Sequence, residues 1–128
     1  MALLEKEIVI EASPDDVWAI VGDVANVADW FEGIEESSVQ DGIRYVTMPG
    51  GMTVTERITG PDHENRTYQY EIIGDMPLDK HHATVTVHDH ADGTLLTWHT
   101  EVEPDAIADV MGLTFDVALA SLKNRLEA

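Results

Sequence analysis

Arg44 and Glu56 are the two residues whose types and spacing most directly suggest chemistry. They lie on either side of residues 49–51, a Pro-Gly-Gly segment that is typical of a hairpin turn. Pairing across this turn predicts Met48 opposite Met52, Val46 opposite Val54, and Arg44 opposite Glu56. Because two of the pairs are apolar, we expect all three to face the interior. There, Arg44 and Glu56 could orient a ligand carbonyl or hydroxyl, or transfer a proton. The alternative is a structural ion pair, because a buried charge needs a partner whatever its function.

The histidines are the second group with potential chemistry. His81 has the parity of the inward positions of its strand, near the rim of the interior, and is the best single acid/base candidate, whereas His82 faces outward. His88, His90 and His99 fall together on the outer face of one predicted hairpin. They could bind a transition metal or be ordinary surface histidines. Because no carboxylate clearly completes the set, we predict no metal site and no cofactor.

Aromatic and thioether side chains surround the candidate polar groups. Tyr68, Tyr70 and Trp98 have inward parity and could stack on a ligand ring or simply fill a core. Methionines such as Met48 and Met111 suit a wall that adapts to a ligand, and equally suit an ordinary core.

Turn residues divide the chain into elements that must position these groups. Seven strands are predicted, at residues 3–11, 34–40, 43–48, 52–59, 66–73, 81–89 and 94–102. A helix over 14–21 and a short helix over 24–31 follow the first strand, and a long helix spans 105–126. Ser13 precedes Pro14 at a helix start, so we interpret Ser13 as an N-cap and not as a nucleophile.

This order, β-αα-β6-α, predicts an α+β fold. A curved, seven-stranded antiparallel sheet would wrap around the C-terminal helix within one domain over residues 1–128. The inward stripe expected for that helix consists of Ile107, Met111, Phe115, Ala118 and Leu122.

The Asp92-Gly93 pair predicts a second hairpin register. With these two residues as the turn, Ala91 faces Thr94. The pairs that follow are Asp89 with Leu96, Val87 with Trp98, Val85 with Thr100, and Ala83 with Val102. Both strands then turn their apolar residues to one face.

The composition limits the class of protein. The 128 residues include 25 acidic and seven basic ones, for a formal net charge of −18, and no cysteine. A polyanionic surface repels phosphate backbones and anionic lipid head groups, so we expect no nucleic-acid partner and no membrane insertion. The charge could serve solubility, as in a salty cytoplasm, or a basic partner or cationic ligand. The first residues lack the apolar run of a signal peptide, so we expect a cytoplasmic protein.

The motifs in their order resemble those of the START-like (SRPBCC) superfamily, with its Bet v 1-like helix-grip fold. Within it, the chain is similar to small bacterial polyketide cyclase/dehydrase and lipid transport proteins. The segments that carry the resemblance are Ile10–Trp18, Asp23 with Trp30, Val54–Ile58, Tyr68–Ile72 and Asp92–Trp98. The resemblance implies a cavity between sheet and helix, and a monomer or weak homodimer. Relatives include aromatase/cyclases, lipid and sterol carriers and hormone receptors, so the fold alone names no reaction.

Three functions stay open from the sequence. The first is binding or transport of a small hydrophobic or amphipathic ligand, such as a lipid, sterol or polyketide-like molecule. The second is a polyketide cyclase or dehydratase, with Arg44, Glu56 and His81 as catalytic candidates. The third is a protein-interaction module with a filled core and an exposed apolar patch. The residues expected to bind a ligand are Trp30, Arg44, Val46, Val54, Glu56, Tyr68, Tyr70, Ile72, His81, Val85, Trp98, Ile107, Met111 and Phe115.

Overall fold

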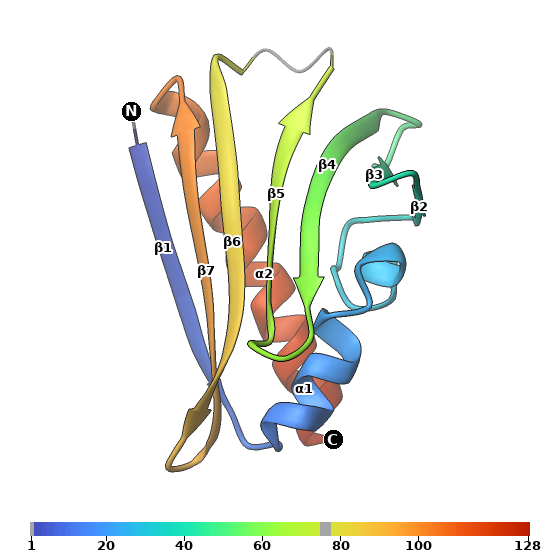
Figure 1. Cartoon of the computed structure of the whole chain (residues 1–128). Helices are drawn as coiled ribbons and strands as arrows, with labels where there is room; N and C mark the ends of the chain where they lie inside the picture. Colours follow the sequence, from blue (N-terminus) through green and yellow to red (C-terminus); the bar gives the residue numbers. More distant parts are fainter. Residues whose placement is uncertain (1, 75–77) are drawn as a thin grey trace.

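Seven strands and three helical segments make up the protein in a computed structural model that describes residues 2–74 and 78–128 (Figure 1). The strands are β1 (Ala2–Ile10), β2 (Glu36–Gln40), β3 (Ile43–Thr47), β4 (Thr53–Asp62), β5 (Thr67–Ile73), β6 (Lys80–His90) and β7 (Gly93–Glu103). The helical segments are α1 (Pro14–Val21), the 3₁₀ helix η1 (Val24–Asp29) and α2 (Ala106–Glu127). No helix among the described residues is long and apolar enough to cross a membrane.

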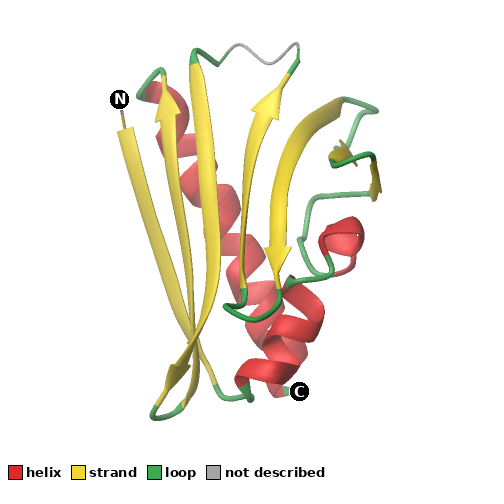
Figure 2. Ribbon diagram, in the orientation of Figure 1, coloured by secondary structure: helices red, strands yellow, loops and turns green. Residues whose placement is uncertain are grey.

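All seven strands belong to one antiparallel sheet in the order β1-β7-β6-β5-β4-β3-β2. Figure 2 shows the sheet curving around α2, which runs diagonally across one face. The predicted α+β class and the curved seven-stranded sheet around the last helix are therefore confirmed. The curvature leaves a concave face that α2 can only partly fill.

The segment after α1 differs from the predicted second helix. It is a 3₁₀ helix that ends at Asp29 instead of extending to residue 31, and Asn26 inside it has non-helical angles (φ −109°, ψ 32°). Runs of 3₁₀ helix are short because their hydrogen-bond geometry is poorer than that of an α-helix. Trp30 and Phe31 therefore follow the helix as buried side chains in irregular backbone.

The β3–β4 register is the predicted one. Arg44 pairs with Glu56 and Val46 with Val54, and the Met48 amide donates to the Met52 carbonyl at 2.8 Å. The Pro-Gly-Gly turn thus fixed the register correctly, because its two glycines adopt positive φ where other residues are strained.

The β6–β7 register was predicted wrongly by two residues. Val87 pairs with Leu96 and Val85 with Trp98, because the turn is Ala91-Asp92 and Gly93 already belongs to β7. Three further pairs on the same face are Asp89 with Thr94, Ala83 with Thr100 and His81 with Val102. A shift of two keeps each side chain on its predicted face, since strands alternate with period two.

Gly93 is needed for a close backbone approach and not for the turn itself. Its φ is +129°, and a Cβ atom there would lie 2.7 Å from the carbonyl oxygen of Ile10. The next residue, Thr94, donates its hydroxyl to the Ala12 carbonyl at 2.7 Å. This contact ties the start of β7 to the segment that leads into α1.

Helix α2 packs through part of the predicted stripe. Phe115, Ala118 and Leu122 are buried as expected, together with Ala108, Gly112 and Leu119. Ile107 and Met111 are only partly buried. Three large apolar residues of the helix stay exposed: Val110, Leu113 and Val117.

Side chains in the last turns of α2 bond to other elements. Lys123 Nζ donates to the Val9 carbonyl at 2.7 Å, and Arg125 donates to the Asp29 carbonyl at 2.7 Å. The Glu127 carboxylate accepts from the Glu11 amide at 2.8 Å. The C-terminal end of the helix is thereby fixed to β1 and η1.

Candidate functional site

An apolar cavity of about 250 Å³ lies between the concave face of the sheet and the N-terminal half of α2. Strands β3 to β6 supply one wall, α2 the other, and the segment after η1 closes one side. The lining residues are Phe31, Ile34, Val46, Met48, Met52, Val54, Glu56, Tyr70, Ile72, His81, Ile107, Val110, Met111, Thr114 and Phe115. Among them, Glu56 supplies the one carboxyl group and His81 the one imidazole.

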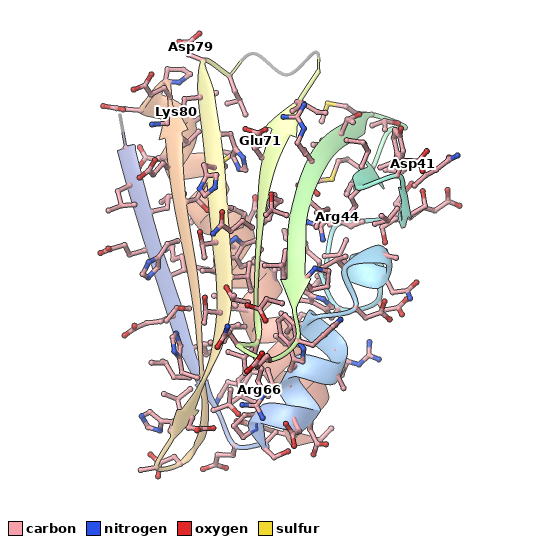
Figure 3. The ribbon with its side chains drawn as sticks, viewed as in Figure 1. Asp41, Arg44, Arg66, Glu71, Asp79 and Lys80 are labelled. Atoms are coloured by element: carbon pink, nitrogen blue, oxygen red, sulfur yellow. The ribbon has the colours of Figure 1, made fainter. Side chains whose placement is uncertain are left out.

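Arg44 and Glu56 form the buried ion pair that the hairpin register predicts. Arg44 Nε lies 2.7 Å from Glu56 Oε1, with residue exposures of 3% and 8%. The guanidinium also donates to the Val24 carbonyl at 3.2 Å. It lies over the rings of Tyr68 and Tyr70, at 5.6 and 5.1 Å from their centres, within the range of cation–π attraction. Figure 3 shows Arg44 beside β4.

The two members of the pair differ in how readily they change charge. Burial raises the pKa of Glu56, although the charge and hydrogen bond of Arg44 act in the opposite direction. Burial also disfavours the charge of Arg44, but Tyr68, Glu56 and Tyr70 together hold its pKa above the usual value. Arg44 therefore stays a cation, whereas burial favours the protonated form of Glu56.

His81 lies at the same level across the sheet as Glu56. Glu56 pairs with Ile72, and continuing the β5–β6 register beyond Tyr70 and Ala83 places His81 next to Ile72. Neighbouring strands are about 4.8 Å apart, so the backbones at Glu56 and His81 are roughly 10 Å apart. The two polar groups thus flank the apolar Ile72.

The His81 ring accepts a hydrogen bond from a backbone amide of β5 that lies beyond the last β5–β6 pair. The Ile72 amide donates to His81 Nδ1 at 3.0 Å. His81 is 5% exposed, and its Nε2 is buried with no hydrogen-bond partner among the described residues. Burial lowers the pKa of His81 to about 4; neighbouring His82 lowers it as well, and Glu71 opposes them. His81 is therefore neutral at physiological pH.

A buried aromatic layer supports the cavity from behind. Trp98 Nε1 donates to the Tyr70 hydroxyl at 3.0 Å, and the Trp98 ring stacks on Phe115 with 4.0 Å between centres. Burial raises the pKa of Tyr70 well above its usual value, so its hydroxyl stays protonated. Tyr70 and Phe115 line the cavity, and Trp98 holds both in place.

The fourteen residues expected at the site divide into two groups. Nine of them line the cavity: Val46, Val54, Glu56, Tyr70, Ile72, His81, Ile107, Met111 and Phe115. Five others, Trp30, Arg44, Tyr68, Val85 and Trp98, are buried but lie outside the lining that the described residues form. These five residues lie behind the cavity wall. The sequence did not separate them from the lining residues, because parity along a strand gives the face of a side chain but not its depth.

Six lining residues were not predicted as site residues: Phe31, Ile34, Met48, Met52, Val110 and Thr114. Met48 and Met52 carried a usable signal, because they continue the inward row of Val46 and Val54. Val110 and Thr114 lie three residues after Ile107 and Met111, the spacing of neighbours on a helix face. Phe31 and Ile34 lie in irregular backbone, where periodicity gives no signal.

The three histidines of the predicted outer cluster, His88, His90 and His99, are exposed. His88 Nε2 lies 3.0 Å from Thr97 Oγ1, and His90 Nδ1 accepts from the Asp92 amide. Within residues 2–74 and 78–128, no three His, Asp or Glu side chains are grouped as metal ligands.

The curved sheet around a C-terminal helix, with a cavity between them, is the helix-grip architecture of Bet v 1-like proteins. A family model described as "Polyketide cyclase / dehydrase and lipid transport" matches residues 1–127. The chain therefore belongs to this SRPBCC-type family, as its motifs had indicated. No curated protein matches the chain in sequence.

Solved structures show the same fold. Protein XoxI from Bacillus cereus has a TM-score of 0.92 at 22% identity, over 98% of this chain and 96% of that one. A protein from Thermobifida fusca has a TM-score of 0.84 at 22% identity, over 98% and 93%. The di-domain ARO/CYC BexL from the BE-7585A biosynthetic pathway has a TM-score of 0.82 at 20% identity, over 97% of this chain and 46% of BexL. At these identities the likeness concerns the fold alone.

Proposed function

We propose that the protein binds a small hydrophobic or amphipathic ligand between the sheet and α2. The observation that carries this proposal is the apolar cavity of about 250 Å³ with four polar side chains in its wall: Glu56, Tyr70, His81 and Thr114. Ligand sites in proteins are typically concave and mostly apolar, with a few placed polar groups that fix orientation. A filled core, which the interaction-module hypothesis requires, is disfavoured by the same observation.

A cavity-filling variant tests this proposal. Val54 lies in the cavity wall, so Val54→Phe should occupy space that a ligand needs. The matched control is Leu113→Phe, because Leu113 is exposed on the outer side of α2. A thermal-shift screen of tetralin, 1-tetralone, palmitate and a sterol would be run on the wild type and both variants.

We expect at least one compound to raise the melting temperature of the wild type and of Leu113→Phe, but not of Val54→Phe. A ligand at one hundred times its Kd stabilises the folded state by about 2.7 kcal/mol, which such a scan detects easily. If no compound shifts the wild-type curve, or if Val54→Phe responds like the control, the proposal is wrong.

A second candidate function is proton transfer on the bound molecule, as in a cyclase or dehydratase. It is favoured by Glu56, which lines the cavity and whose pKa is raised by burial, toward the range useful to a general acid or base. The test is exchange of the α-protons of 1-tetralone in D₂O, followed by NMR. Exchange above the buffer rate that Glu56→Gln abolishes would support catalysis; equal rates in wild type, Glu56→Gln and buffer would exclude it for this ketone.

A further inference from the structure

We propose that His81 selects the ligand through its Nε2–H, and that the ligand is a compact neutral molecule of one or two rings with a hydrogen-bond acceptor such as a ketone oxygen. This inference rests on the proposed binding function and narrows its ligand class. It is carried by the bonding of the His81 ring, by the charges in the wall and by the cavity volume.

The bond from Ile72 fixes which His81 nitrogen carries the proton. A backbone amide can only donate, so Nδ1, at 3.0 Å from the Ile72 nitrogen, must be the acceptor. A neutral imidazole with an unprotonated Nδ1 carries its hydrogen on Nε2. His81 therefore presents a donor at Nε2, and no acceptor for it exists among the described residues.

An unpaired donor in this place points to a ligand. Buried polar groups in native proteins are nearly always hydrogen-bonded, and an unsatisfied one needs an explanation. Trp30 Nε1 and Thr100 Oγ1 are also buried without partners, but neither residue lines the cavity. His81 is the one of the three that lines it. Because its Nε2 is covered in this structure, a ligand acceptor would pair with this donor after a small shift of the surrounding side chains.

The charges of the wall exclude anionic ligands. No Lys or Arg belongs to the lining formed by the described residues. The nearest cation, Arg44, is engaged by Glu56 Oε1 and the Val24 carbonyl. A carboxylate ligand would be buried beside Glu56 without a cation of its own, which is strongly unfavourable. A fatty acid is therefore a poor ligand, whereas a neutral ketone leaves the Arg44–Glu56 pair intact.

The volume sets the size of the ligand. At about 250 Å³, the cavity lies just below the range of roughly 300–1,000 Å³ found for drug-sized ligands. One or two fused rings suit this volume, which is at the low end for a ligand site.

A matched pair of probes separates this inference from cavity binding in general. Tetralin and 1-tetralone have the same two-ring skeleton and differ in one carbonyl group. Their Kd values would be measured by calorimetry for the wild type, His81→Phe and the control His82→Phe, which alters the outward neighbour of His81. The anion 2-naphthoate serves as the charged comparator.

We expect 1-tetralone to bind the wild type and His82→Phe about tenfold more tightly than tetralin, because pairing a buried donor is worth about that factor. In His81→Phe the ratio should fall to about twofold or less, and 2-naphthoate should not bind the wild type. Equal ratios in all three proteins, or tight binding of 2-naphthoate, would overturn the inference while leaving the binding function intact. If neither ring compound binds the wild type but palmitate or the sterol stabilises it, this inference fails and the binding function stands; if none of these compounds binds, both proposals fail.

A measurement on the wild type keeps the test independent of how His81→Phe folds. Two-bond ¹H–¹⁵N NMR spectra report which ring nitrogen of each histidine is protonated. We expect His81 to be the Nε2–H tautomer, with its Nε2 resonance shifting on addition of 1-tetralone and not of tetralin. An Nδ1–H tautomer, or no difference between the two probes, would refute the assignment.

Discussion

Replacing Arg44 by methionine is the perturbation whose outcome the structure defines most sharply. Arg44 is 3% exposed and bonded to Glu56 at 2.7 Å, so Arg44→Met leaves a buried carboxylate without its cation. Breaking a buried pair by removing one partner costs about 3–5 kcal/mol. We expect a loss of that size at pH 7 in urea unfolding followed by tryptophan fluorescence.

The pH dependence identifies the cause of that loss. Without Arg44, the pKa of Glu56 rises further above its unfolded value, so the folded state binds the proton more readily than the unfolded chain does. The loss of stability caused by the unpaired carboxylate is then complete above the pKa that Glu56 has in the folded state. It disappears below the pKa that Glu56 has in the unfolded chain. Each pH unit between these limits changes stability by about 1.36 kcal/mol, so lowering the pH from 7 to 5 should recover at most about 2.7 kcal/mol of the loss relative to wild type.

The control is the double variant Arg44→Met with Glu56→Gln, which removes the stranded charge. It should be more stable than Arg44→Met at pH 7, and its stability relative to wild type should not improve at pH 5 as that of Arg44→Met does. If Arg44→Met lost the same free energy at both pH values, or if the double variant were no better, uncompensated charge would not be the cause. The loss would then have to come from packing against Tyr68 and Tyr70.

Two further predictions concern His81 and Gly93. The pKa of His81 is lowered to about 4, below its unfolded value near 6.5, so its contribution to stability is present above about pH 6.5 and is lost as the pH falls toward 4. His81→Phe should therefore lose less stability than wild type between pH 7 and 5, by up to about 2 kcal/mol in unfolding titrations; equal losses would contradict the assigned pKa. Gly93→Ala should cost at least about 2 kcal/mol, because it adds left-handed strain to a contact with the Ile10 carbonyl. Gly42→Ala, also at positive φ but facing open space, should cost less in the same assay, and equal costs would show that the contact is unimportant.

The β3–β4 hairpin shows what the sequence can predict. Its turn residues and its two apolar pairs agree on one register, and the Arg44–Glu56 pair follows from it. In the β6–β7 hairpin the apolar pattern fixed the face but allowed shifts of two residues, and Gly93 was misleading. Gly93 is required by the approach of the Ile10 carbonyl, a contact between segments more than eighty positions apart that local patterns do not contain.

The chemistry of His81 shows where sequence reasoning stops. Parity along β6 predicted an inward side chain, and His81 does line the cavity. Its tautomer depends on a bond to Ile72 at a point where the β5–β6 pairing has ended. The sequence also does not predict how deep an inward side chain lies. Val85 and Ile72 share the inward parity, but of the two only Ile72 lines the cavity.

The bonds that Lys123, Arg125 and Glu127 make fix the end of α2 to β1 and η1, so we expect this end to open less readily than the first turns. The fixed end covers the core, and the other end, from Ala106 to Thr114, covers the cavity. On the proposed binding function, we expect a ligand to enter by local opening of the first helical turns, which costs less free energy than global unfolding. Amide hydrogen exchange should follow this gradient, fast in the first turns and slow near Leu122; uniform protection along α2 would rule the gradient out.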